Sequence, residues 1–331
     1  MILRIFKGTG PGVISLIIVT LIAFWASAFL NPQMPAAFNY EAIPMPLYGF
    51  LKQITGNNPL VGVIFSFSMV CFMAFLLVNF NTTVFFINER TFFPALVYIL
   101  FSGLFPQYQL LNPVLPASVF LMLAIRRIMD GYLKPETAYS FFDAGILIST
   151  GSLFYANLIW FGLLVIIGIA MLRTGNLKEI AISILGLLTP YLLAFGLYYV
   201  IGKDLAALLS LIGNNLLDKS AGYQFSKLTI VALIFAGIFI LVSIAFLFKL
   251  MNTKKIKSRK TFSLLIWVFL ISIGIYIVLP SVSVEIVWLI NIPVSYFLAH
   301  YFVFVKKRLV PEIFFAVMLV IILLIQIWYL K

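Results

Sequence analysis

The acidic residue best placed to do chemistry is Glu41, in the stretch FNYEAIPMPLYGFLKQITGNNP (residues 38–59) between the first two long apolar segments. The chain has only ten acidic residues, so each of them limits the reactions that the protein can support. A carboxylate at this position can act as a general base or help to hold a divalent cation. The alternative is that Glu41 is a solvated loop residue.

Two further acids belong to expected helices, Glu285 at the start of one and Asp143 about one turn inside another. Glu285, in PSVSVEIVWLINIP, lies where a helix is expected to begin. It can help to shape a binding groove, or it is there only because the N-terminus of a helix favours a negative charge. Asp143, in YSFFDAG, is expected to be the most buried acid. It is predicted to form a structural ion pair with one of three arginines: Arg90, Arg126 or Arg127.

The sequence contains no common catalytic motif. It lacks a P-loop, the HExxH zinc motif, the GxSxG nucleophile motif and the glycine-rich dinucleotide fingerprint. A single histidine and a single cysteine exclude a common zinc site and an intramolecular disulfide. Any site must therefore be built from carboxylates, amides and aromatic side chains.

Membrane-spanning helices are the elements that must position these residues. Apolar residues make up 63% of the 331 residues, charged residues make up 10%, and the mean hydropathy is +1.15. Soluble domains carry about 25% charged residues, so this chain must use lipid as its solvent. We expect an all-α polytopic membrane protein with one transmembrane domain over residues 1–331, beginning with an uncleaved span.

Apolar runs of spanning or near-spanning length predict eleven transmembrane helices. The third to fifth, between residues 91 and 153, are short and are expected to be little tilted, broken, or set in a locally thinned or protein-lined region. The predicted spans are 12–30, 60–80, 91–105, 113–125, 138–153, 156–172, 180–201, 229–250, 261–280, 286–304 and 311–330.

The basic residues predict the orientation, because cytoplasmic loops carry an excess of lysine and arginine. With the N-terminus in the cytoplasm, only five of the 22 basic residues lie outside: Lys52, Lys203, Lys219, Lys227 and Lys331. The C-terminus is then periplasmic. This asymmetry explains the formal net charge of +12 without a nucleic-acid partner, and the basic cytoplasmic loop 249–260 is expected to contact anionic lipid.

Two outer loops, 31–59 and 202–228, are long enough to hold structure of their own. Each carries an apolar stripe at helical spacing, which predicts a short amphipathic helix in the membrane interface. Pro46 can begin the first helix and Gly56 can end it. The stripes are Leu47, Phe50, Leu51 and Ile54 in the first loop and Leu205, Leu208, Leu209 and Ile212 in the second. The two helices are expected to line one groove at the outer face.

The order of these parts resembles that of the GT-C-type membrane glycosyltransferases. The resemblance rests on the long outer loop after the first span, on NERTFFPALVYILFSGLFPQ and LPSVSVEIVWLINIPVSYFLAHYF, and on short helical hairpins that end in Arg-Arg. It covers most of the first 175 residues and a patch at 280–302. It implies a GT-C-like bundle that moves sugars from polyprenyl-phosphate carriers at the outer face. The sequence also looks like an uncharacterised family of multi-pass inner-membrane proteins from Bacteroidota.

The resemblance assigns roles to individual residues. Glu41 would be the catalytic base, where the GT-C pattern has an aspartate, and Tyr40 beside it would contact substrate. Lys52 and Lys203 would hold the carrier phosphate as point charges, in place of the arginines of that superfamily. Glu285 would complete the substrate groove. A divalent cation is expected only together with a catalytic Glu41.

Three functions are open on the sequence alone. The first is a transferase that uses a lipid-linked donor at the outer face of a bacterial inner membrane. The second is a non-catalytic scaffold or accessory subunit that binds lipid or another membrane protein. The third is a transporter, against which the scarcity of charge in the middle of the spans counts.

Overall fold

A computed structural model describes residues 2–6, 8, 10–32, 44–56, 58–132, 138–172, 177–218, 226–306 and 309–330. Every regular element in these residues is a helix, which confirms the predicted all-α architecture. The elements are α1 (Ile2–Ile5), α2 (Pro11–Leu30), α3 (Pro46–Thr55), α4 (Pro59–Val84), α5 (Phe93–Ser102), η2 (Pro106–Tyr108), α6 (Val114–Asp130), α7 (Ala138–Ser152), η3 (Ala156–Phe161), α8 (Gly162–Leu172), α9 (Leu177–Val200), α10 (Leu205–Leu217), α11 (Lys227–Met251), α12 (Ile256–Val278), η4 (Val284–Ile286), α13 (Val287–Phe304) and α14 (Leu309–Leu330).

Seven helices in the described residues are long and apolar enough to cross a membrane, as expected for a polytopic membrane protein. They are α2, α4, α9, α11, α12, the η4–α13 segment and α14. The other four predicted spans correspond to α5, α6, α7 and η3–α8, which are shorter than the roughly 20 residues that a span needs. The predicted number of eleven spans is therefore not confirmed.

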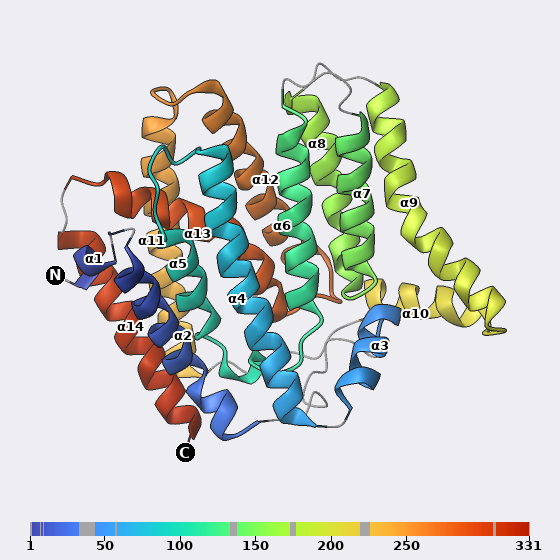
Figure 1. Ribbon diagram of the computed structural model, residues 1–331, viewed down its shortest axis with the longest axis horizontal. Helices are drawn as coiled ribbons and strands as arrows, with labels where there is room; N and C mark the ends of the chain where they lie inside the picture. The colour runs from blue at the N-terminus through green and yellow to red at the C-terminus, as the bar shows by residue number, and fades with distance from the viewer. Residues whose placement is uncertain are drawn as a thin grey trace.

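The short helix α5 and the long helix α13 pack against each other in the left half of the view in Figure 1. All ten residues of α5 are buried, and so is most of α13. α13 packs against α5, α6, α11 and α12, and α2 and α4 also pack against α5. Because protein rather than lipid surrounds α5, its length need not match the thickness of the bilayer.

The C-terminal end of α5 is satisfied by buried amide side chains. Gln109 Nε2 donates to Ser102 O at 3.0 Å and to Phe24 O at 2.9 Å. Gln326 Nε2, from α14, donates to Gly103 O at 2.9 Å. The last carbonyls of a helix have no partner within it, and leaving them unpaired in the interior is costly. These two glutamines therefore allow α5 to end inside the bundle.

Helix α9 is attached to the bundle mainly through α7, against which it packs more extensively than against α8 or α10. The two backbones approach closely at two glycines. A Cβ atom on Gly186 would lie 2.4 Å from Phe142 O, and one on Gly145 would lie 2.6 Å from Ser183 O. Small residues permit such approaches between membrane helices.

The two predicted amphipathic helices are present as α3 and α10, at the same end of the bundle (Figure 1). We call this the α3–α10 end, and we call the opposite end, where residues 252–255 join α11 to α12, the basic end. Gly56 ends α3 with a φ of +61°, a conformation that favours glycine. Phe50, Ile54 and Leu209 are 60%, 65% and 61% exposed. Their apolar side chains are thus available to lipid, as a helix in the membrane interface requires.

Candidate functional site

The most enclosed acid at the α3–α10 end is Glu285, in the single turn η4 that leads into α13. Its side chain is fully buried. Oε1 accepts two hydrogen bonds of 2.9 Å, one from Tyr155 Oη and one from the backbone N–H of Ser283. The bond to Ser283 is local, because the carboxylate turns back onto the loop that precedes it. The bond to Tyr155 joins this loop to the connection between α7 and η3.

Three segments meet at the loop that precedes Glu285: the start of η3, the C-terminal end of α10 and the 279–283 loop itself. Ser281 Oγ donates to Leu216 O at 2.8 Å and to Asn157 Oδ1 at 3.3 Å. Asn157 Nδ2 donates to Asn215 O at 3.4 Å. Carbonyls in the last turn of a helix lack a partner within it. Ser281 and Asn157 therefore hold the end of α10 against the bundle.

The other carboxyl oxygen of Glu285, Oε2, is buried and has no hydrogen-bond partner among the described residues. No lysine or arginine among the described residues pairs with the Glu285 carboxyl group. The ion pairs among these residues are those of Arg127 with Asp130 and Asp143. An unsatisfied buried polar atom costs about 1–3 kcal/mol, so it calls for an explanation. Oε2 can hydrogen-bond a hydroxyl or amide group of a ligand, or take part in proton exchange.

Helix α3 is fixed to the same region as Glu285. The backbone N–H of Leu47 donates to Leu153 O at 3.1 Å, just beyond the end of α7. Tyr48 is buried, and its hydroxyl donates to Leu111 O at 3.1 Å. The chain between Leu153 and Tyr155 therefore connects α3 on one side to Glu285 on the other.

The two lysines predicted to hold phosphate lie at this end on separate elements. Lys52 Nζ lies 5.5 Å from the centroid of the Tyr48 ring, and Lys203 Nζ lies 5.3 Å from that of Tyr198. In the part of the chain that the structure describes, neither ammonium group has an acidic partner. No described contact joins either lysine to Glu285. The fold thus brings the three residues to one end without assembling them into one cluster.

Glu41 and Tyr40 lie outside the described residues, so their catalytic and substrate-binding roles stay predictions. Among the residues that are described, no group of three or more histidine, cysteine, aspartate or glutamate side chains could hold a metal ion. The predicted divalent cation therefore stays tied to Glu41.

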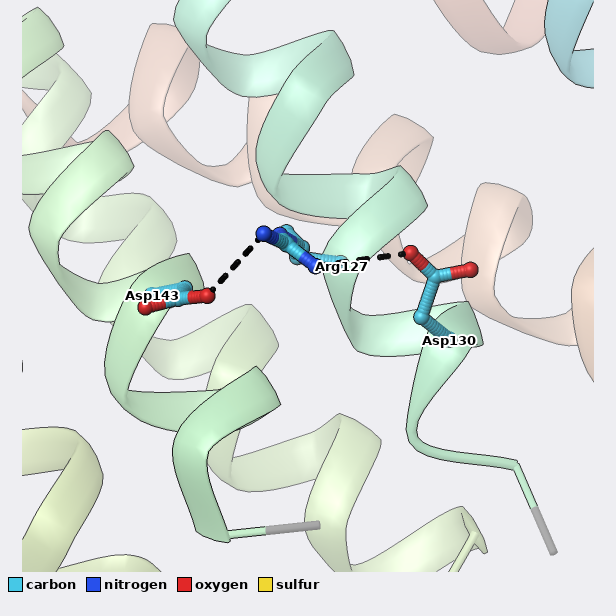
Figure 2. Close-up of polar contacts among 3 residues, drawn as sticks. All are labelled: Arg127, Asp130 and Asp143. Carbon is cyan, nitrogen blue, oxygen red and sulfur yellow. Dashed lines mark ion pairs between the residues drawn. The ribbon is translucent and has the colours of Figure 1, made fainter. Parts of the chain in front are cut away.

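Asp143 lies at the basic end, on α7, and its ion-pair partner is Arg127 of α6. Arg127 Nη2 lies 3.2 Å from Asp143 Oδ2, and Arg127 Nη1 lies 4.0 Å from Asp130 Oδ2 (Figure 2). Arg90 is exposed and Arg126 is half-buried, and neither reaches Asp143. The expectation that Asp143 is the most buried acid is wrong: its side chain is 39% exposed, whereas Glu285 is fully buried. Asp143 does lie within a helix, α7, as the sequence predicted, but its side chain is on a partly exposed side of that helix.

Replacing Asp143 with asparagine is expected to lower the free energy of unfolding by less than about 1 kcal/mol. Exposed ion pairs contribute about 0–1 kcal/mol, and Arg127 keeps Asp130 as a partner. Urea unfolding of the purified protein in detergent measures the change. A loss of several kcal/mol would show that this pair is essential to the packing of α6 against α7.

The sequence did not predict the residues that surround Glu285. In the sequence, Tyr155 and Asn157 belong only to a short connection between two apolar runs, and Ser281 belongs to a loop. A weak signal was present, because polar side chains in short connections between apolar helices must satisfy backbone groups nearby. Which backbone groups they reach depends on the position of α10, which the sequence does not give.

A family model matches residues 46–330, which include α3, Lys52 and Lys203. They also include Glu285 and the residues described around it, Tyr155, Asn157, Ser281 and Ser283. The chain belongs to the family of unknown function DUF6427. The DUF6427 match begins at the first residue of α3, so Tyr40 and Glu41 precede it. No curated protein and no solved structure matches the chain.

Proposed function

We propose that the protein is a membrane transferase that takes a glycosyl or related group from a polyprenyl-phosphate carrier at the α3–α10 end. This end faces the periplasm in the proposed orientation, with the N-terminus in the cytoplasm and the C-terminus in the periplasm of a bacterial inner membrane. The bundle is GT-C-like in this proposal, and the four short helices complete the predicted set of eleven. Nucleic acid is not a partner.

One observation carries the proposal: each of the two amphipathic helices at this end contains or closely follows a lysine that has no acidic partner among the described residues. Phe50 and Ile54 of α3 are well exposed and apolar, and Lys52 lies between them in sequence. Lys203 lies just before α10, whose Leu209 is likewise exposed. A lipid-linked phosphate needs this combination, because its tail is apolar and its head is anionic.

The proposed reaction is a single displacement. A hydroxyl oxygen of the acceptor bonds to the anomeric carbon of the sugar as the bond from that carbon to the carrier phosphate oxygen breaks. Glu41 takes the proton of the hydroxyl group, and the polyprenyl phosphate leaves with the electron pair. Lys52 and Lys203 stabilise the anionic phosphate. Tyr40 and Glu285 contact the sugar or the acceptor.

Replacing Glu41 with glutamine tests this function. The variant is expected to lose about 10²- to 10⁴-fold of the transfer rate, because removal of a general base has an effect of this size. Lys52→Gln and Lys203→Gln are each expected to raise the KM for the lipid-linked donor about tenfold, since each removes a charge-assisted contact. Transfer of a labelled hexose from polyprenyl phosphate is measured in membranes that contain the full chain.

The matched control is Asp218→Asn, which removes an exposed acid at the end of α10. It is expected to keep normal activity and membrane abundance. If Glu41→Gln transfers sugar like the wild type, or if the wild type transfers none, the proposal is wrong.

The second candidate function is a non-catalytic scaffold or accessory subunit. It is favoured by the exposure of α9 and α11. Only 22% of the most apolar 18-residue stretch of each helix is buried within the protein. Lipid or another membrane protein must cover these faces. This function predicts that a membrane protein co-purifies at a fixed stoichiometry, and a homogeneous monomer carrying polyprenyl lipid would argue against it. Transport, the third hypothesis, has no comparable observation in its favour.

A further inference from the structure

A pocket of about 580 Å³ lies near the basic end, where α11, the C-terminal end of α13 and the start of α14 meet. Its position along α11 separates it from the site proposed above. Lys249 lies 22 residues after Lys227, the first residue of α11, which is about 33 Å at the rise of an α-helix. The pocket is therefore independent of the proposed transferase site.

One face of α11 forms a wall of this pocket. Val242, Phe246, Lys249 and Leu250 line it, and their spacing of four, three and one residues puts them on one side of the helix. Opposite them stand Tyr301 and Phe304 of α13, and Val310 at the start of α14. Val242 and Val310 are 42% and 45% exposed, so the apolar wall is open to its surroundings. In a membrane protein these surroundings are acyl chains.

Two lysines, Lys249 and Lys306, give the pocket its charge. Neither pairs with an acid in the described residues, and none of the nine described lining residues is acidic. Two neighbouring lysines, Lys260 and Lys254, do not line the pocket and have contacts of their own. Lys260 Nζ donates to Met171 O at 2.6 Å, and Lys254 Nζ lies 4.8 Å from the centroid of the Phe304 ring. Lys249 and Lys306 are therefore available to an external anion.

The Tyr301 side chain adds a polar group to an otherwise apolar wall. Its ring packs edge-on against Phe246, with centroids 5.3 Å apart and an interplanar angle of 87°. No described group accepts a hydrogen bond from its hydroxyl. A phenol held in this way can donate to a phosphate oxygen while its ring stays in the apolar wall.

We propose that this pocket binds an anionic phospholipid from the leaflet at the basic end. Its acyl chains lie along Val242, Phe246 and Val310, and its phosphate lies between the ammonium groups of Lys249 and Lys306. A pocket of this volume accommodates a headgroup and the first part of the chains. Basic pockets between membrane helices recognise anionic headgroups in this way. A free phosphate would leave the apolar wall unused, so the occupant is a lipid.

Native mass spectrometry of the full chain in detergent, titrated with dioleoyl phosphatidylglycerol, tests the proposal. Either Lys249→Gln or Lys306→Gln is expected to weaken binding roughly fivefold, and the double variant about thirtyfold. Val242→Trp fills the pocket and is expected to reduce binding about tenfold or more. Dioleoyl phosphatidylcholine is expected to bind the wild type more weakly, and glycerol 3-phosphate is expected not to displace the bound lipid.

The control is the double variant Lys255→Gln, Lys257→Gln, which removes the same charge from exposed positions near the same end but outside the lining of the pocket. It is expected to bind phosphatidylglycerol within twofold of the wild type. Equal weakening in the two double variants would show that binding is only a general attraction between a basic end and anionic lipid. That result would overturn the proposed binding site. Displacement by glycerol 3-phosphate, or normal binding by Val242→Trp, would overturn it as well.

Discussion

Glu285→Ala is expected to lower the free energy of unfolding by about 2–5 kcal/mol. The carboxylate accepts hydrogen bonds from Tyr155 Oη and from the Ser283 N–H, and both donors are buried with it. Each buried donor left without an acceptor costs about 1–3 kcal/mol. The loss is larger than for an exposed acid, because water cannot replace the missing acceptor.

A double-mutant cycle separates this effect from a general loss of packing. Tyr155→Phe removes only the hydroxyl donor and is expected to cost about 1 kcal/mol. Once alanine stands at position 285, the same change is expected to cost almost nothing, since the acceptor is already gone. Glu285→Gln keeps an acceptor oxygen and is expected to be milder than Glu285→Ala. Urea unfolding in detergent measures the four proteins of the cycle and Glu285→Gln, and strictly additive losses in the cycle would contradict the hydrogen bond.

Gly186→Leu is expected to lower the free energy of unfolding by about 3 kcal/mol or more and to loosen α9 from α7. The first side-chain atom would lie 2.4 Å from Phe142 O, which is a backbone atom and cannot rotate away. The two helices must separate, which also breaks the 2.8 Å hydrogen bond between Ser152 Oγ and Tyr191 Oη. Overpacking of this kind exceeds the cost of an ordinary core substitution.

Gly196 supplies the matched control, because it lies on the same helix and a Cβ atom added there would meet no other atom within 4 Å. Gly196→Leu is expected to leave stability unchanged or to raise it by up to about 1 kcal/mol, through better helix propensity. Unfolding and limited proteolysis in detergent compare the two variants. Equal stability of the two would contradict the close approach of α7 and α9.

Local signals in the sequence were enough to predict the amphipathic helix α3 and its two ends. Pro46 and Gly56 bracket it, and the observed helix runs over Pro46–Thr55 with Gly56 in the left-handed region. Proline at a helix start and glycine at its end act through their own backbone geometry, which does not depend on distant residues. The apolar stripe in the second outer loop likewise predicted a helix, and this helix is α10.

The sequence could not fix the number of spanning helices. A short apolar run has the same residue pattern whether lipid or protein surrounds it. In the structure, α5 is enclosed by protein on every side. The glutamines that end α5 inside the bundle, Gln109 and Gln326, are 217 positions apart in sequence. Their role depends on α14 packing beside α5, which is a tertiary fact.

The sequence by itself determined that this chain is an all-helical membrane protein with a basic and a less basic side, because composition and charge act without knowledge of packing. It also marked Glu285 as an acid at the start of a helix. Only the tertiary structure decided that Glu285 is fully buried, that Tyr155 donates to it, and that one of its oxygens has no described partner. The physical reason is that burial and hydrogen bonding are set by segments more than a hundred residues apart, which meet only when the helices pack.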